Sequence, residues 1–128
     1  MLVDAERAGA DALEELLGDE DDVAIAAITV AELSVGVELA DPPRRERRQT
    51  FVDAVLDAVS IEAYEVDVAK AHGALLAHAR RTGRPRGAHD LIIGATARAR
   101  RREVVTSDHD GFADLPEVTL RTSARDKR

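Results

Sequence analysis

The chain has 128 residues, which is the length of one domain with its own hydrophobic core. It carries a formal net charge of −7 and no cysteine, so a disulfide framework and a thiolate zinc site are excluded and a reducing, cytoplasmic setting is expected. No apolar run approaches the roughly 20 residues that span a bilayer, and no signal segment opens the sequence, so we expect no membrane partner. Aromatic residues are only 2% of the chain, which predicts a core of Ala, Val, Leu and Ile.

Helix and strand patterns alternate along the sequence. In chain order they predict a helix over 5–17, a strand over 23–28, a helix from Thr29 to the Asp-Pro-Pro at 41–43, a helix over 44–58, a strand within 60–66, a helix over 68–81, a helix that begins at 88 or 89, a strand over 103–107 and a last strand over 118–120. Alternating elements of this length imply an α/β fold, with parallel strands covered by helices on both faces. We expect residues 1–128 to form a single domain, with 121–128 as a flexible basic tail.

Asp90 is the most informative single residue. Pro85 and Gly87 keep the backbone out of a helix until the residues just before Asp90, so this acid lies in a first helical turn. The helix dipole and the free N–H groups favour a carboxylate there. Ile93 and Gly94 follow on the same helix face, so Asp90 heads an apolar face that must be buried and needs a partner, a capping role or a metal ion.

Other acids also follow the predicted strands. Glu32 comes one helical turn after the strand over 23–28, and Asp108 and Asp110 come directly after the strand over 103–107. Ligands of open α/β sheets bind at the carboxyl ends of the strands, where these acids and Asp90 could converge. Carboxylates that share a small cavity repel one another unless a hard cation lies between them, which favours Mg²⁺ or Mn²⁺.

Each acid also has a purely structural interpretation. Thr29 and Glu32 fit a Thr-x-x-Glu capping box at the start of a helix. Asp108 and Asp110 fit a polar turn, and Asp90 fits a helix cap. The argument for a functional site therefore depends on the clustering of the acids.

Three segments resemble the motifs of PIN-domain ribonucleases, in particular the VapC toxins of toxin–antitoxin pairs. They read AITVAEL at 27–33, GRPRGAHDLIIGATA at 83–97 and VVTSDHDGF at 104–112, and the resemblance covers nearly the whole chain from Val23 onward. It implies a PIN-like parallel sheet flanked by helices on both faces. It further implies a Mg²⁺-dependent endoribonuclease, with Mn²⁺ as a substitute, that acts as a toxin on RNA, forms a homodimer and is held by a cognate antitoxin.

The resemblance also assigns site residues. Glu32, Asp90 and Asp108 match the metal-binding catalytic acids of the family, and Thr29 and Thr106 lie beside them in the motifs. The third motif departs from the family's VVTSDPDDF pattern, because His109 replaces Pro and Gly111 replaces Asp. Asp110 is a second-tier candidate for the position that Gly111 leaves empty.

The start of the chain departs further from the family pattern. Relatives of this type open with a strand that ends in a first metal-binding Asp, and two interpretations of Asp4 follow. In the first, which we favour, the central strand and its acid are missing. The alternative function that goes with it is a catalytically impaired or truncated PIN-like module that binds an antitoxin without cleaving RNA. In the second, residues 1–4 form a stub strand and Asp4 is the first acid.

The charge distribution bears on an RNA partner. A net negative charge argues mildly against nucleic acid, but arginines cluster at 44–48, 80–86 and 98–102. Such clusters can be solvated helix faces, or they can contact phosphates without reading sequence. We expect RNA to be positioned by phosphate contacts, because the chain offers few aromatic rings for stacking.

Overall fold

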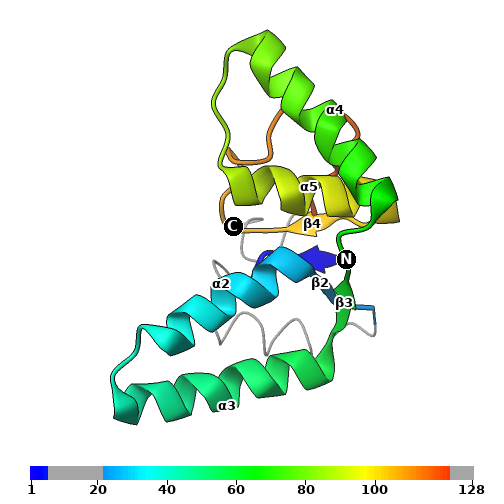
Figure 1. Ribbon diagram of the computed structural model, residues 1–128. Helices are drawn as coiled ribbons and strands as arrows, with labels where there is room; N and C mark the ends of the chain where they lie inside the picture. The colour runs from blue at the N-terminus through cyan, green and yellow to red at the C-terminus, as the bar shows by residue number, and fades with distance from the viewer. Residues whose placement is uncertain (6–21, 122–128) are drawn as a thin grey trace, which may run out of the picture.

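The computed structural model describes residues 1–5 and 22–121, and it confirms the predicted α/β class. Its elements are β1 (Leu2–Val3), β2 (Ala24–Ala26), α2 (Ala27–Glu38), α3 (Pro42–Ala58), β3 (Ser60–Glu62), α4 (Val66–Thr82), α5 (Ala88–Arg100) and β4 (Val104–Val105) (Figure 1). Among these residues, no helix combines the length and the apolar character that crossing a membrane requires.

The four strands form one parallel sheet in the order β3-β2-β1-β4. β1 is therefore an inner strand, with Leu2 aligned to Ala24 on one side and to Val104 on the other. The prediction that the central strand is missing is wrong. Two residues suffice because backbone groups are paired on both sides, for example where Asp4 N–H donates to the Val105 carbonyl at 2.9 Å.

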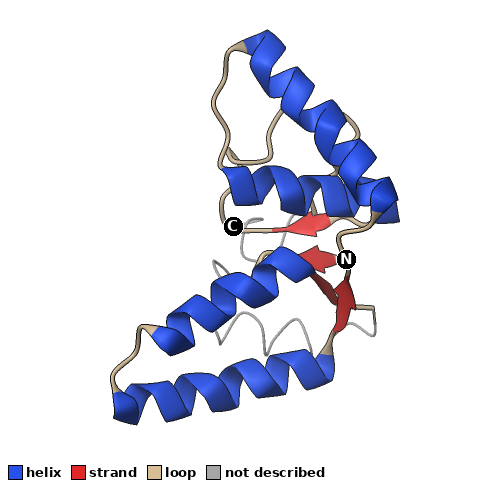
Figure 2. Ribbon diagram, viewed as in Figure 1, coloured by secondary structure: helices blue, strands red, loops and turns tan. Residues whose placement is uncertain are grey.

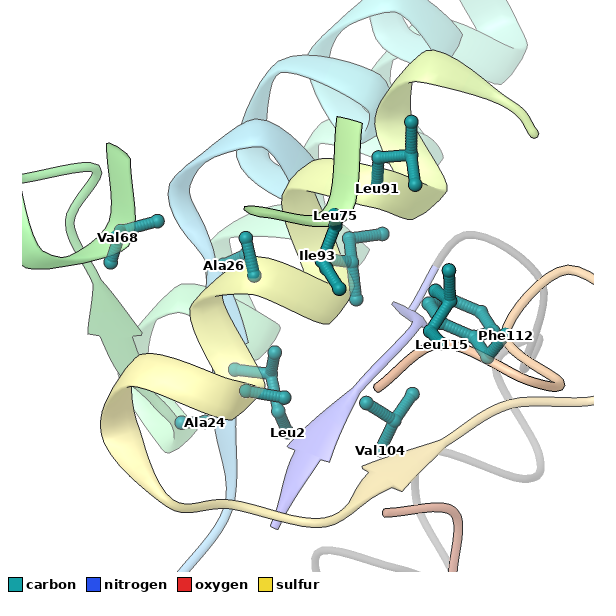
Figure 3. Packing of buried hydrophobic residues seen from close by; sticks show 12 residues of the cluster. Leu2, Ala24, Ala26, Val68, Leu75, Leu91, Ile93, Val104, Phe112 and Leu115 are labelled. Carbon is teal, nitrogen blue, oxygen red and sulfur yellow. The ribbon is translucent and has the colours of Figure 1, made fainter. Parts of the chain in front are cut away.

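Helices cover both faces of the sheet, as predicted (Figure 2). Successive strand residues point to opposite faces, so Leu2 and Val104 pack with α4 and α5 whereas Val3 and Val105 pack with residues of α2 and α3. Figure 3 shows the first of these two clusters, which also contains Leu75, Ile93, Phe112 and Leu115. The sheet therefore lies between two separate apolar clusters, which fix the positions of the strand ends.

Two local predictions fail at the start of α2. The helix begins at Ala27, directly after β2, and its N-cap residue Ala26 makes no side-chain capping bond. Thr29 is therefore fully buried inside the first turn, and the capping box is wrong. The sequence pattern misplaced this boundary because Ala and Ile at 25–28 suit a buried strand and a buried helix equally well.

The predictions at the chain ends have mixed outcomes. The helix predicted over 5–17 lies outside the described residues beyond Ala5. The predicted last strand is present as a single parallel bridge between Leu120 and Val104, and Arg121 N–H donates to the Val104 carbonyl at 2.9 Å. The rest of the predicted tail, 122–128, is not described.

Candidate active site

Residues of four elements meet where the strands end. Asp4 follows β1 directly and is only 2% exposed, and Thr106 follows β4 and is buried. α2 continues from the end of β2 and carries Thr29 and Glu32. The first turn of α5 carries Asp90, as predicted from Pro85 and Gly87.

Thr106 links two of the acids. Its Oγ1 donates a hydrogen bond to Asp4 Oδ2 at 3.0 Å and accepts one from Asp108 N–H at 3.0 Å. A hydroxyl has a single proton to donate, so these two bonds determine its orientation. Asp4, which the sequence offered as a possible first acid, therefore shares the Thr106 hydroxyl with the Asp108 amide, and the signal for it was an acid directly after an apolar Leu-Val pair.

Asp90 and Asp108 face each other across Gly111. A methyl group on Gly111 would lie 2.7 Å from Asp90 Oδ2 and 3.0 Å from Asp108 Oδ2, and the Gly111 N–H donates to Asp108 Oδ1 at 3.2 Å. Asp90 is 6% exposed and lies in the first turn of α5, so its carboxylate is a buried charge close to Asp108. Gly111 leaves a space between two carboxylates that any other residue would fill.

α2 brings Glu32 and Thr29 to the start of α5. Glu32 Oε2 lies 3.3 Å from Nδ1 of His89, the residue before Asp90. Thr29 is fully buried, and its Oγ1 has no hydrogen-bond partner among the described residues. An unsatisfied buried hydroxyl costs about 1–3 kcal/mol, so a polar ligand near this helix turn would offset an existing cost.

Asp110 is not brought into this group. Its side chain is exposed, and its contact with the rest of the fold is made by its carbonyl oxygen, which accepts a hydrogen bond from Arg86. Strand position alone could not separate Asp108 from Asp110, because both follow the same strand, and only the family resemblance ranked Asp108 first.

The carboxylate oxygens at the strand ends suit a hard divalent cation that takes few ligands from the protein. Within residues 1–5 and 22–121, no three Asp, Glu or His side chains are gathered closely enough to ligate one ion together. Mg²⁺ is usually held by one or two carboxylates and keeps several waters. Asp90 and Asp108, with the space beside Gly111, fit that smaller requirement.

The family model of the PIN domain matches residues 1–118, so the chain belongs to the PIN-domain family. The chain is of the VapC type, as two relatives show. It is 30% identical to a solved member of the VapBC family of toxin-antitoxin systems, VapBC-5 from Mycobacterium tuberculosis, with a TM-score of 0.76 over 94% of this chain and 97% of that one. It is also 28% identical over 106 residues to Ribonuclease VapC2 from Rickettsia felis, covering 83% of this chain and 78% of the relative.

A second solved structure supports the fold alone. FitAcB from Neisseria gonorrhoeae is 22% identical and superposes with a TM-score of 0.79 over 94% of this chain and 97% of that chain. The resemblance seen in the three sequence motifs is therefore confirmed at the level of family and architecture.

Proposed function

We propose that this protein is a Mg²⁺-dependent endoribonuclease, with Mn²⁺ able to substitute, that acts as the toxin of a toxin–antitoxin pair. The observation that carries the proposal is the group of acids at the strand ends, in which Thr106 binds both Asp4 Oδ2 and the Asp108 amide, and the carboxylates of Asp90 and Asp108 both lie beside Gly111. The relative named a ribonuclease supports the reaction class.

We assign a separate role to each polar residue of this group. Asp90 and Asp108 would hold Mg²⁺, which when bound lowers the pKa of a water ligand and offsets charge on a phosphate. Thr106 orients Asp4 and Asp108 through its two hydrogen bonds, so Asp4 Oδ2 stays directed toward the group. Glu32, beside His89, supplies a further carboxylate that can accept a proton.

Two of the three arginine clusters are suited to bind RNA. Arg80 and Arg81 are exposed at the end of α4, and the following loop leads to the first turn of α5 and Asp90. The cluster over 98–102 is different, because Arg98, Arg100 and Arg102 form ion pairs with acids of the fold. We propose that phosphate contacts come from Arg80 and Arg81 and from the cluster over 44–48.

The surface of the α2–α3 hairpin supports an antitoxin partner and a homodimer. Leu39 is 81% exposed and Val35 53% exposed, and a surface hollow nearby on α3 is lined by Phe51 and the arginines 44, 47 and 48. Exposed apolar side chains beside positive charge suit a partner segment with apolar and acidic residues. The solved relatives include toxin–antitoxin complexes, which favours this partner class.

The alternative function, an impaired module that binds an antitoxin without cleaving RNA, rested on the missing central strand. Because β1 is present and carries Asp4, that reason no longer applies. The cytoplasmic setting remains part of the proposal, since an RNA substrate is expected there.

The test is Asp90→Asn, compared with Asp53→Asn on the exposed face of α3 as the matched control. An amide cannot supply the charge that Mg²⁺ requires, so we expect Mg²⁺-dependent cleavage of a generic RNA to be lost in the first variant and retained in the second. Undiminished cleavage by Asp90→Asn, at an unchanged melting temperature, would remove Asp90 from the site and the proposal with it.

A further inference from the structure

Arg86 connects the two segments that carry Asp90 and Asp108. It precedes Gly87, the N-cap residue of α5, and its guanidinium donates through Nη1 to the Asp110 carbonyl and through Nη2 to the Ala113 carbonyl. These partners are 24 and 27 residues away in sequence. One side chain therefore joins the start of α5 to the loop after β4.

The loop that Arg86 holds is itself an ordered turn. The amides of Phe112 and Ala113 both donate to the His109 carbonyl, at 3.1 and 2.9 Å, and Phe112 is buried in the core. The Gly111 amide donates to Asp108 Oδ1 within the same turn. If the backbone at residues 110–113 moved, the Gly111 amide and the Asp108 carboxylate that it binds would move with it.

Arg84 provides a contrast, because it also joins the two segments. It pairs with Asp114 at 2.8 Å, but the two side chains are 55% and 74% exposed. Exposed ion pairs of this kind contribute about 0–1 kcal/mol and define little geometry. Arg86 instead holds two backbone carbonyls in the fixed fork of a guanidinium, a geometry that the single ammonium of lysine does not reproduce.

We propose that Arg86 is a positioning residue that sets the separation of Asp90 and Asp108, and thereby the affinity of their site for Mg²⁺. The proposal rests on the proposed function. Its physical basis is that the space between the two carboxylates depends on where Gly111 lies, and Arg86 binds the carbonyls on either side of Gly111. Because Nη1 and Nη2 of Arg86 each already bind a carbonyl, its guanidinium is held within the fold and is less suited than that of Arg84 to contact a phosphate.

The experiment compares Arg86→Lys and Arg86→Met with Arg84→Lys and Arg84→Met. Calorimetry measures Mg²⁺ binding without RNA, steady-state cleavage gives kcat and KM, and hydrogen exchange reports the amides of residues 111–113. For both Arg86 variants we expect Mg²⁺ affinity and kcat to fall about 10–100-fold, as is usual when a partner of a metal ligand is removed. We expect KM for RNA to change little, amide exchange in the loop to speed up, and both Arg84 variants to resemble the wild type in Mg²⁺ affinity.

The results separate this inference from the proposed function. Wild-type Mg²⁺ affinity in Arg86→Lys, or equal losses in the Arg84 and Arg86 variants, would overturn the positioning role while leaving the ribonuclease proposal in place. A wild-type protein that neither binds Mg²⁺ nor cleaves RNA would overturn both, even if the loop exchanged faster. A raised KM with unchanged Mg²⁺ affinity in Arg86→Lys would assign Arg86 to RNA binding instead.

Discussion

The two ends of α5 use acidic residues in opposite ways. At the C-terminal end, acids are paired with fixed arginines. Arg100 contacts Glu62 at 3.0 Å and Asp67 at 2.7 Å, and Arg102 contacts Asp22 at 2.7 Å and Glu62 at 3.1 Å. These ion pairs join the C-terminal end of α5 to the segment before β2, to the last residue of β3 and to the start of α4.

At the N-terminal end, the acids are grouped with one another. Asp90 and Asp108 lie on either side of Gly111, and a threonine hydroxyl and backbone amides supply contacts to Asp4 and Asp108. Carboxylates gathered in this way favour a cation, whereas carboxylates paired with arginine favour the folded chain. The comparison therefore separates acids that we expect to affect activity from acids that we expect to affect stability.

The largest expected effect is on RNA cleavage, and it is measured by changing one acid in the group near the N-terminal end of α5 and one acid in the ion-pair network at its C-terminal end. Asp4→Asn should lower Mg²⁺-dependent RNA cleavage by about 100-fold or more, because it removes the charge of a buried carboxylate from the proposed site. Its melting temperature should stay unchanged or rise as repulsion is relieved. Asp22→Asn is the control and should keep full activity. Normal cleavage by Asp4→Asn would exclude Asp4 from the site.

Gly111→Ala should give the next largest effect. Its methyl group would lie 2.7 Å from Asp90 Oδ2, so one of the two must move, and we expect Mg²⁺ affinity and cleavage to fall about 10–100-fold. Gly73→Ala in α4 is the matched control, since nothing lies within 4 Å of its added methyl group. That variant should keep activity and gain up to about 1 kcal/mol of stability. Wild-type cleavage by Gly111→Ala would show that the space beside Gly111 has no role.

Arg102→Met should affect stability only. The side chain of Arg102 is 16% exposed and pairs with two acids, so its loss should reduce the free energy of unfolding by about 1.5–3 kcal/mol. RNA cleavage at a temperature where the variant is folded should remain normal, and Arg101→Met, an exposed neighbour, should change neither quantity. A loss of activity in folded Arg102→Met would mean that the two ends of α5 are coupled.

The smallest effect is a pH dependence at the same network. The hydrogen bond and the charge of Arg102 hold the pKa of Asp22 below its ordinary value of 3.8. A lowered pKa in the folded state means that the pair stabilises the protein above pH 3.8 and loses this contribution as the pH falls through the folded value. The free energy of unfolding, measured in urea, should therefore differ less between wild type and Asp22→Asn at pH 3 than at pH 5. These two pH values lie about one unit below and above the ordinary pKa of 3.8. A constant difference would contradict this assignment.

Part of the site could be predicted from local sequence. Pro85 and Gly87 restrict the backbone before α5, which is why Asp90 was correctly placed in a first turn. Asp108 was placed correctly after a strand because Val104 and Val105 are β-branched and apolar. These are properties of a few neighbouring residues, so no knowledge of the fold was needed.

The rest required the tertiary structure. A strand of two residues, Leu2–Val3, has no recognisable period and exists because β2 and β4 pair with it, so the sequence could not decide between a missing central strand and a stub strand that ends at Asp4. The same holds for Arg86, whose carbonyl partners lie 24 and 27 residues away. The sequence alone determined the family and the alternation of helices and strands, because these depend on local pattern. Only the tertiary structure decided which acids meet, which arginines are already paired and which residue holds the loop, because these depend on contacts between distant segments.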